Sequence, residues 1–465
     1  MNLTRSMKLL AVCLIALAVV LAGCGSSDKS GANNASGTSN TSASGSTGET
    51  GDGGQQSGDN GKVTEITAVI YSNYEEAMKQ VIEAFEQQHP NIKVKLFSSP
   101  FAQMMETIEI KMSTASDDVD LLFVDSPLTM NYSIKGYLEP LDDWLGIDPK
   151  QVWTQSTIDA GTYNGQMMAA PINSSSQVLY LNKDLFEANG VPLPAENERM
   201  TWEQLVEIGQ KLTADTNGDG QTDIFGFSFD QVDRAYQLLP LVNSLGGQMM
   251  SEDGLKADGY TNSPEAVQAF QFYSDLFNKY KISPKIKKEE TIEYFTSGKV
   301  AMFLAANHSL PRIKDSGINF AVTLHPYFEG GKVVTPTGAW GMGISKYSKN
   351  KEAAAEFLKF LTVERQGAEI FFQVAGTLPA QLELLNEIET NPVYEEFPNN
   401  ILRIAAKESV ETAVLRPKSP GYLEWETIIN TAFEDIKFGS DVKKALDNAA
   451  YEVDRLLKKY EGTVN

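Results

Sequence analysis

Cysteine, histidine and positive charge are all scarce in this sequence of 465 residues. The two cysteines, Cys13 and Cys24, both lie near the N-terminus, so no disulfide can hold the rest of the chain together. The histidines, His89, His308 and His325, leave few imidazole ligands for a catalytic zinc ion. A formal net charge of −22 disfavours nucleic acid and anionic membrane surfaces as partners, because like charges repel. We therefore expect neither a nucleic-acid-binding protein nor a metallohydrolase.

Long apolar runs are also missing after the first 24 residues. A transmembrane helix needs about 20 consecutive apolar residues, and no such stretch follows. No internal repeat is visible. A chain of this length without disulfides must be stabilised by buried apolar side chains, and it should divide into two or more cores.

The N-terminus has the layout of a secretory signal peptide. Arg5 and Lys8 provide a basic start, and residues 9–22 carry no charge. The following Leu-Ala-Gly-Cys, ending at Cys24, resembles the lipobox of bacterial lipoproteins, in which the cysteine receives a diacylglycerol and the leader is cut before it. We predict a signal peptide at 1–23 and a lipidated Cys24; an uncleaved anchor or a plain secreted protein are the alternatives.

Residues 25–61 contain mainly Ser, Gly, Asn and Thr and almost no large apolar side chain. Such a segment cannot bury enough surface to offset the entropy of ordering its backbone. We interpret 24–61 as a lipidated N-terminus with a flexible linker that lets the folded part stand off the membrane.

The folded part begins with alternating strand and helix patterns. Residues 63–71 and 92–97 read as strands, a helix with an apolar face lies between them, and Asn73 with Glu76 is a plausible helix cap. Residues 119–124 form a nearly continuous apolar run that ends at Asp125. This order predicts an α/β lobe with a largely parallel sheet. Ligands gather at the carboxyl ends of such strands, where Tyr71, Asn73 and Asp125 lie.

A second lobe is predicted to begin near Pro171. Residues 178–181 and 300–304 read as strands, Thr201 with Gln204 resembles a capping box, and Ser263 precedes another helix. The tail is expected to be mostly helical, at 352–361, 366–374, 422–438 and 442–457.

One loop follows the pattern of a calcium-binding EF-hand. Acidic or amide side chains recur at alternate positions, with Gly220 at the sixth, but the twelfth position is Gly226 rather than the usual bidentate Glu. We predict a weakly bound structural Ca²⁺, and an Asx-rich turn without an ion is the alternative. The predicted ligands are Asp215, Asn217, Asp219, Gln221 and Asp223.

Several blocks, in order, resemble family 1 extracellular solute-binding proteins, the maltose-binding-protein-like group that serves ABC sugar importers. They are MMAAP at 167–171, LYLNKDLF at 179–186, TWEQL at 201–205, GKVAM at 298–302 and KNKEAAAEFL at 349–358. The resemblance runs from about Val63 to the C-terminus. It implies a type II periplasmic-binding-protein fold, with two α/β lobes joined by crossing hinge strands near 171–176, 305–308 and 345–350. Lobe one would comprise 62–172 with 308–345, and lobe two 173–307 with 346–465.

The same resemblance implies which residues meet a ligand between the lobes. Carried over by position, they are Tyr71, Asn73, Tyr74, Asp125, Arg234, Tyr236, His308, Trp340, Tyr422 and Trp425. His308 stands where relatives commonly carry Trp. The glycines beside Trp340 suggest that the backbone there is kept clear of a neighbour. Asp and Arg suit sugar hydroxyls, and aromatic rings suit the apolar faces of a sugar.

The resemblance implies a binding protein, not an enzyme. It would capture a carbohydrate, expected to be an oligosaccharide, on the extracellular face of the cell membrane and deliver it to the transmembrane subunits of an ABC permease. We expect a monomer that requires no cofactor, with the structural Ca²⁺ as an option. Two alternatives remain open: a surface-anchored glycoside hydrolase, which needs a pair of carboxylates across the sugar, and a ligand-presenting accessory of a membrane sensor.

Overall fold

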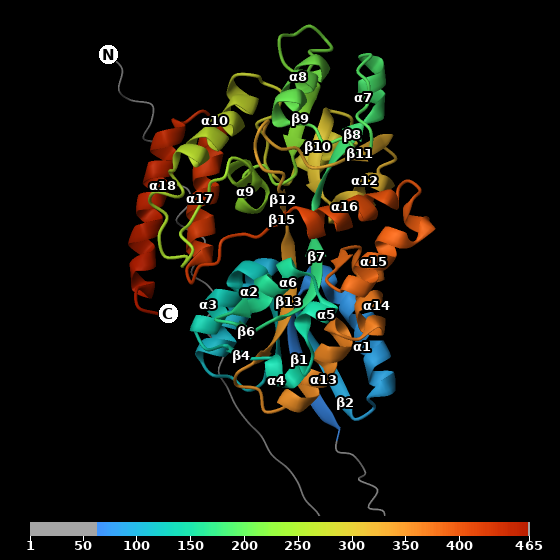
Figure 1. The fold of residues 1–465 in the computed structure, drawn as a ribbon, viewed down its shortest axis with the longest axis vertical. Coiled ribbons are helices and arrows are strands. Elements are labelled where there is room, and N and C mark those ends of the chain that lie inside the picture. The colour runs from blue at the N-terminus through green and yellow to red at the C-terminus, as the bar shows by residue number, and fades with distance from the viewer. Residues whose placement is uncertain (1–62, 464–465) are drawn as a thin grey trace, which may run out of the picture. The chain divides into compact units, whose positions relative to one another are not determined.

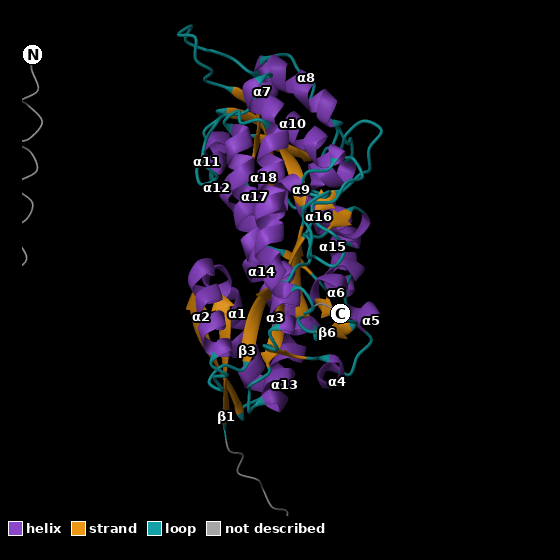
Figure 2. Cartoon of the chain, turned by 90° about the vertical axis from the view of Figure 1, so that its left-hand side faces the viewer, coloured by secondary structure: helices purple, strands orange, loops and turns teal. Residues whose placement is uncertain are grey.

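The computed structural model describes residues 63–463 of the chain (Figure 1). The signal peptide, Cys24 and the linker lie outside the described residues, so those predictions are not addressed by the fold. None of the helices in the described part is long and apolar enough to cross a membrane. Helices and strands alternate through much of the chain, as predicted for an α/β protein, and Figure 2 shows helices packed around the strands.

The first lobe is built around a seven-stranded sheet with the order β14-β7-β13-β3-β1-β2, and β4 pairs with β13 at one side. Strands β1 and β2 are parallel, as are β1 and β3, whereas β13 runs antiparallel to both β3 and β7. All five residues of β3 are buried, as its apolar run predicts. The strands are β1 (Thr64–Tyr71), β2 (Ile92–Ser99), β3 (Leu121–Asp125), β4 (Leu138–Glu139), β7 (Ala170–Ser175), β13 (Gly338–Ser345) and β14 (Leu378–Pro379).

Helices cover this sheet, among them α1 (Glu75–Gln88) and α2 (Phe101–Ser113). Helix α1 buries Met78, Val81 and Phe85, the apolar face that the sequence predicts. The predicted cap is wrong: Tyr74 is the N-cap residue of α1 and makes no side-chain capping bond, because the short 3-10 helix Ser72–Tyr74 leads directly into α1. The other helices and small strands of this part are α3 (Thr129–Ile134), α4 (Asp142–Leu145), α5 (Pro149–Val152), α6 (Gln155–Gly161), β5 (Thr162–Tyr163) and β6 (Gln166–Met167).

The second lobe is built around a four-stranded sheet with the order β11-β8-β10-β9. Its strands are β8 (Gln177–Asn182), β9 (Phe225–Phe229), β10 (Val300–Ala306) and β11 (Phe320–Thr323), and β8 and β10 are buried throughout. The helices up to β11 are α7 (Lys183–Ala188), α8 (Trp202–Leu212), α9 (Ala235–Ser244), α10 (Pro264–Asn278), α11 (Thr291–Thr296) and α12 (Leu310–Asp315). The predicted capping box of α8 is confirmed: Thr201 and Gln204 satisfy each other's backbone N–H groups.

Helices also make up most of the tail, as the sequence predicts. They are α13 (Lys351–Thr362), α14 (Arg365–Ala375), α15 (Leu382–Thr390), α16 (Asn400–Glu411), α17 (Tyr422–Lys437) and α18 (Val442–Leu457).

The structure corrects the expected lobe boundaries. Segment 308–345 does not belong to lobe one as a whole, because β11 pairs with β8 and buries Phe320 and Val322 in the second core. Segment 346–465 is not all in lobe two, because α13 and α14 pack on α1, where Phe357 meets Phe85 with ring centroids 5.1 Å apart. The chain therefore passes between the lobes at other places than expected.

The first crossing, at Ser176 between β7 and β8, lies where the sequence predicts it. The crossings expected at 305–308 and 345–350 are wrong, because β10 continues into α12 beside its own sheet and β13 continues into α13 on the first sheet. The chain instead crosses through 324–337, and again between β14 and α16. Strand β12 (Thr335–Pro336) lies in the connection 324–337 and pairs in parallel with β15 (Ala413–Val414), which follows α16, between the two sheets in Figure 1.

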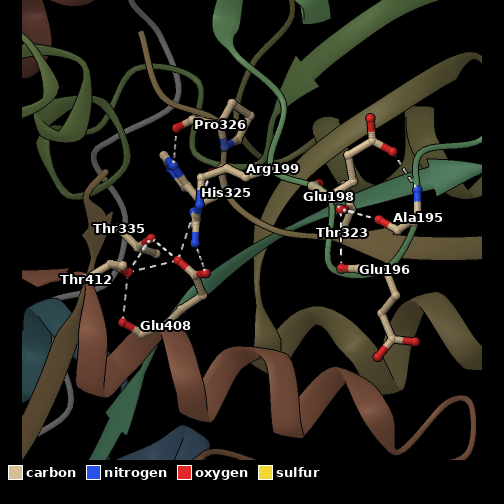
Figure 3. Close-up of polar contacts among 10 residues, drawn as sticks. All are labelled: Ala195, Glu196, Glu198, Arg199, Thr323, His325, Pro326, Thr335, Glu408 and Thr412. Atoms are coloured by element: carbon tan, nitrogen blue, oxygen red, sulfur yellow. Dashed lines mark hydrogen bonds and ion pairs between the residues drawn. The ribbon is translucent and has the colours of Figure 1, made fainter. Parts of the chain in front are cut away.

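A buried carboxylate anchors the connections. Glu408 on α16 is 1% exposed and accepts hydrogen bonds from Arg199, Thr335 and Thr412 (Figure 3). Arg199 also donates to the main-chain oxygen of His325, at 2.7 Å. Because Thr335 begins β12 and Thr412 precedes β15, this network ties the connection 324–337 and the start of β15 to the second lobe.

Candidate ligand-binding cleft

A cleft of about 520 Å³ opens between the carboxyl ends of β1 and β3, strand β13 and the second lobe. Tyr71 ends β1 and Asp125 ends β3, which is the edge at which an α/β sheet presents its ligands. The lining residues come from both lobes and from their connections. They are Tyr71, Asn73, Tyr74, Phe101, Asp125, Asn173, Ser174, Ser175, Gln231, Arg234, Tyr236, His308, Gly338, Ala339, Trp340, Ala375, Thr377 and Arg416.

Most of the residues expected to meet a ligand do line this cleft. From the first lobe these are Tyr71, Asn73, Tyr74, Asp125 and Trp340; from the second they are Arg234, Tyr236 and His308. The sheet explains the convergence, because Trp340 is paired directly with Asp125 across β13 and β3.

Tyr422 and Trp425 do not line the cleft, so this part of the prediction is corrected. Both are core residues of α17, exposed by 1% and 0%. The Tyr422 hydroxyl donates a hydrogen bond to Glu426 at 3.0 Å, behind the cleft wall. Their apolar bodies complete the helical face that packs against α10 and α18.

Other lining residues were missed by sequence reasoning, notably Phe101, Asn173, Gln231, Thr377 and Arg416. Phe101 begins a helix, and Asn173 lies within a strand, where a polar residue amid buried neighbours is a usable signal. Arg416 lies in an irregular segment after β15, and no periodic pattern could have placed it.

Aromatic rings form one wall of the cleft. The Trp340 ring stacks on Phe123 with centroids 4.8 Å apart, and Tyr71 and Phe101 lie 5.7 and 6.0 Å from it. Burial raises the pKa of the neighbouring Tyr74 hydroxyl, and hydrogen bonding to Asn173 opposes that shift. Because Phe123 is buried beneath Trp340, the indole is held as a platform at the cleft surface.

A buried ion pair forms the base of the cleft. The Arg416 guanidinium donates to both carboxylate oxygens of Asp125, at 3.1 and 2.5 Å. Burial disfavours the charged form of Arg416, but Asp125, Tyr422 and Glu426 together outweigh this effect, so the pKa of Arg416 lies well above its ordinary value. This bidentate pair holds the connecting segment after β15 against the end of β3.

The second lobe contributes a further ion pair and a tyrosine hydroxyl. Arg234 donates to Glu426 at 3.1 Å, so both arginines of the lining are already paired with carboxylates. The Tyr236 hydroxyl lies 2.9 Å from the Ser175 hydroxyl, and burial raises its pKa. The Gln231 side-chain oxygen has no partner within the described part of the chain, and so remains a free acceptor.

Glycines beside Trp340 accommodate protein neighbours. A Cβ at Gly341 would come within 3.0 Å of Ala169, and one at Gly338 within 3.0 Å of the Ser175 hydroxyl and 3.3 Å of the Tyr236 ring. The expected clearance therefore exists, but at Gly341 it serves strand packing.

The proposed calcium loop is exposed, and its acidic groups bind their own backbone. Asp215 accepts from the N–H groups of Gly218 and Gly220, and Asp223 accepts from Thr216. These bonds lower the pKa of Asp215 and of Asp223. Within residues 63–463, no three His, Cys, Asp or Glu side chains are gathered closely enough to hold a metal ion. The calcium site therefore stays a prediction.

Two α/β lobes around a polar and aromatic cleft define the class of two-lobe solute receptors. The family model of bacterial extracellular solute-binding proteins matches residues 71–368, and the chain belongs to this family.

Known relatives and structures are similar over most of the chain. A putative binding protein of Brucella abortus is 26% identical over 412 residues, 86% of this chain and 94% of that protein. The sn-glycerol-3-phosphate-binding periplasmic protein UgpB of Rhizobium meliloti is 29% identical over 301 residues, 62% of this chain and 67% of that protein. The ABC substrate-binding protein Lmo0181 of Listeria monocytogenes, in complex with cycloalternan, has a TM-score of 0.73 at 24% identity, covering 85% of this chain and 99% of that one. Maltose-bound T. maritima MalE3 has a TM-score of 0.69 at 23% identity, covering 84% and 100%. These structures share the two-lobe fold predicted from the sequence.

Proposed function

We propose that the chain captures a neutral carbohydrate, an oligosaccharide, in the cleft and delivers it to the transmembrane subunits of an ABC importer. The observation that carries the proposal is the lining, which sets an aromatic wall around Trp340 against polar groups on the opposite side. Sugars present apolar C–H faces and hydroxyl rims, and this arrangement suits both. The expected ligand-binding residues that line the cleft would make these contacts.

The charges of the lining favour a neutral ligand over a phosphorylated one. A phosphate needs cationic groups that are free to pair with it. Arg416 is held by Asp125, and Arg234 by Glu426. The similarity to an sn-glycerol-3-phosphate-binding protein therefore supports the class of receptor but not its ligand.

A glycoside hydrolase is the rival function, and the lining disfavours it. Hydrolysis needs two carboxyl groups on either side of the glycosidic bond. Of the described residues that line the cleft, Asp125 is the sole carboxylic acid, and Arg416 occupies both of its oxygens. A ligand-presenting role beside a membrane sensor would use the same cleft; permease genes next to this one would favour transport.

Lobe closure would follow from ligand binding. A ligand shifts the balance between open and closed forms only by its preference for the closed one. A micromolar dissociation constant corresponds to about −8 kcal/mol, which a few stacked rings and buried hydrogen bonds can supply. The receptor would act as a monomer, tethered to the outer face of the membrane by the lipid on Cys24.

The proposal is tested by titrating residues 62–465, which lie within one compact unit of the chain, with mono- and oligosaccharides and sn-glycerol 3-phosphate. We expect saturable binding of a neutral sugar by calorimetry, no turnover of that sugar, and at least about tenfold weaker binding in Trp340→Ala. Trp144→Ala is the matched control, since Trp144 is also partly buried but lies outside the lining. Hydrolysis of the sugar, or tight binding of the phosphate alone, would refute the proposal.

A further inference from the structure

Strand β7 contains an extra residue opposite Trp340. Trp340 pairs with Asn173, but the next residue of β13, Gly341, pairs with Pro171, so Ile172 has no partner in β13. This is a β-bulge, which bends a strand and changes the direction of a neighbouring side chain. The irregularity lies where β13 presents its indole to the cleft.

The Asn173 side chain bridges the strands at this bulge. Asn173 is 2% exposed, and its Oδ1 accepts a hydrogen bond from the Trp340 main-chain N–H at 3.1 Å. Its Nδ2 donates to the Thr377 hydroxyl at 3.3 Å, next to β14. Side chains in strands normally stand perpendicular to the sheet, so a carboxamide that reaches the backbone of the next strand belongs to the bulge.

We propose that Asn173 is a positioning residue that sets the orientation of Trp340 in the cleft. Removing the amide leaves the partly buried Trp340 N–H without this acceptor, and the bulge then relaxes to recover a partner. The indole, which is fixed on one face by Phe123, tilts when its own backbone moves. The inference rests on the proposed function in one respect: Trp340 is the ring expected to stack on the sugar.

The test follows Trp340 directly in the absence of any sugar. The chain has five tryptophans, so ¹⁵N-tryptophan labelling of the full chain gives a small set of NMR signals, and Trp340→Phe assigns those of Trp340. In Asn173→Ala we expect the Trp340 main-chain amide to exchange with D₂O at least about fivefold faster, and its indole signal to shift. Trp153, Trp202 and Trp425 should not change, since they are buried elsewhere.

Two further variants keep the test decisive. Asn173→Asp retains an acceptor for the Trp340 N–H, so it should keep the wild-type exchange rate even if stability falls. Thr377→Val removes one of the groups that hydrogen-bond to the amide and leaves Tyr74 in place, and should shift the Trp340 signals less but in the same direction. Asn182→Ala is the matched control, because Asn182 Oδ1 also accepts backbone N–H groups, at the start of α7.

Unchanged Trp340 signals in Asn173→Ala would overturn the proposal, and so would equal changes at all five tryptophans, which would indicate general loosening. These outcomes do not depend on any sugar. Failure of the carbohydrate titration would therefore refute the proposed function alone, and an unmoved Trp340 would refute the positioning role alone.

Discussion

Arg416 keeps its charge inside the cleft wall because Asp125 accepts hydrogen bonds from both of its terminal nitrogens. The two side chains are 8% and 10% exposed, so water has little access to either partner. Breaking a buried pair is costly because it leaves an uncompensated charge. The pair therefore contributes to holding the segment after β15 in place as well as to the polarity of the cleft.

We predict that Asp125→Asn lowers the free energy of unfolding by about 3 kcal/mol, measured by urea denaturation. The amide can still accept one hydrogen bond but cannot neutralise Arg416. Glu452→Gln breaks the exposed pair with Arg455 and should cost less than about 1 kcal/mol. Equal losses in the two variants would contradict this account.

The buried His325 should make the free energy of unfolding depend on pH. Burial disfavours its charged form and lowers its pKa from 6.5 to about 4, although the nearby Glu408 carboxylate acts in the opposite direction. Between these two values the unfolded chain binds a proton that the folded chain does not, so stability falls as the pH falls. Above pH 6.5 the ring is neutral in both states and contributes no slope.

We expect the wild-type chain to lose up to about 3 kcal/mol of unfolding free energy through His325 between about pH 7 and about pH 4, in addition to other groups. His325→Phe keeps a ring against Trp202 and should remove this part of the slope. Urea denaturation of both proteins across the pH range measures it. Parallel pH profiles for the two would show that His325 does not titrate in this way.

At the scale of elements, sequence patterns were reliable where one face of a helix or strand is buried. The apolar face of α1, the Ser263 cap of α10, the capping box of α8 and the buried run of β3 all follow from local sequence patterns. Strand β11 could not be assigned to a sheet in this way, because its partner β8 lies well over a hundred residues earlier in the chain.

The same distinction separates the site residues that local patterns predict from those that they do not. Residues at strand ends, such as Tyr71 and Asp125, were predictable, because the sheet edge is set by the strand pattern. Arg416 and Asn173 were not, because they reach the cleft through an irregular segment and a bulge. Tyr422 and Trp425 were misplaced because an aromatic residue on a helix gives the same sequence pattern whether its side chain faces a ligand or the core.

The loop 215–223 gives a prediction about metal removal. If the loop binds Ca²⁺ with a dissociation constant of about 10⁻⁴ M, free calcium at about 100 times that constant adds about 2.7 kcal/mol to the unfolding free energy. Denaturation with calcium and with a chelator measures this difference, and Asp219→Asn should reduce it. Equal stability in the two conditions would leave an Asx-rich turn as the explanation of the motif.

At the scale of the whole molecule, we expect the acidic chain to be held at the membrane by the predicted lipid on Cys24. We predict that Cys24→Ser moves the chain from the membrane fraction to the soluble fraction of the cell envelope or medium, measured by fractionation and immunoblotting. Cys13→Ser is the control and should leave the chain at the membrane, since Cys13 would be removed with the leader. A Cys24→Ser chain that still sediments with membranes would contradict a lipid anchor.

The position of β13 has a consequence for how the protein is made. This strand lies between β7 and β3 in the first sheet, yet it consists of residues 338–345, whereas β1, β2 and β3 are complete by residue 125. Until the ribosome has made β13, the early strands lack the neighbour that closes their sheet, and such long-range pairing is slow to form. The first sheet of a nascent chain therefore cannot be completed until residue 345 has been made.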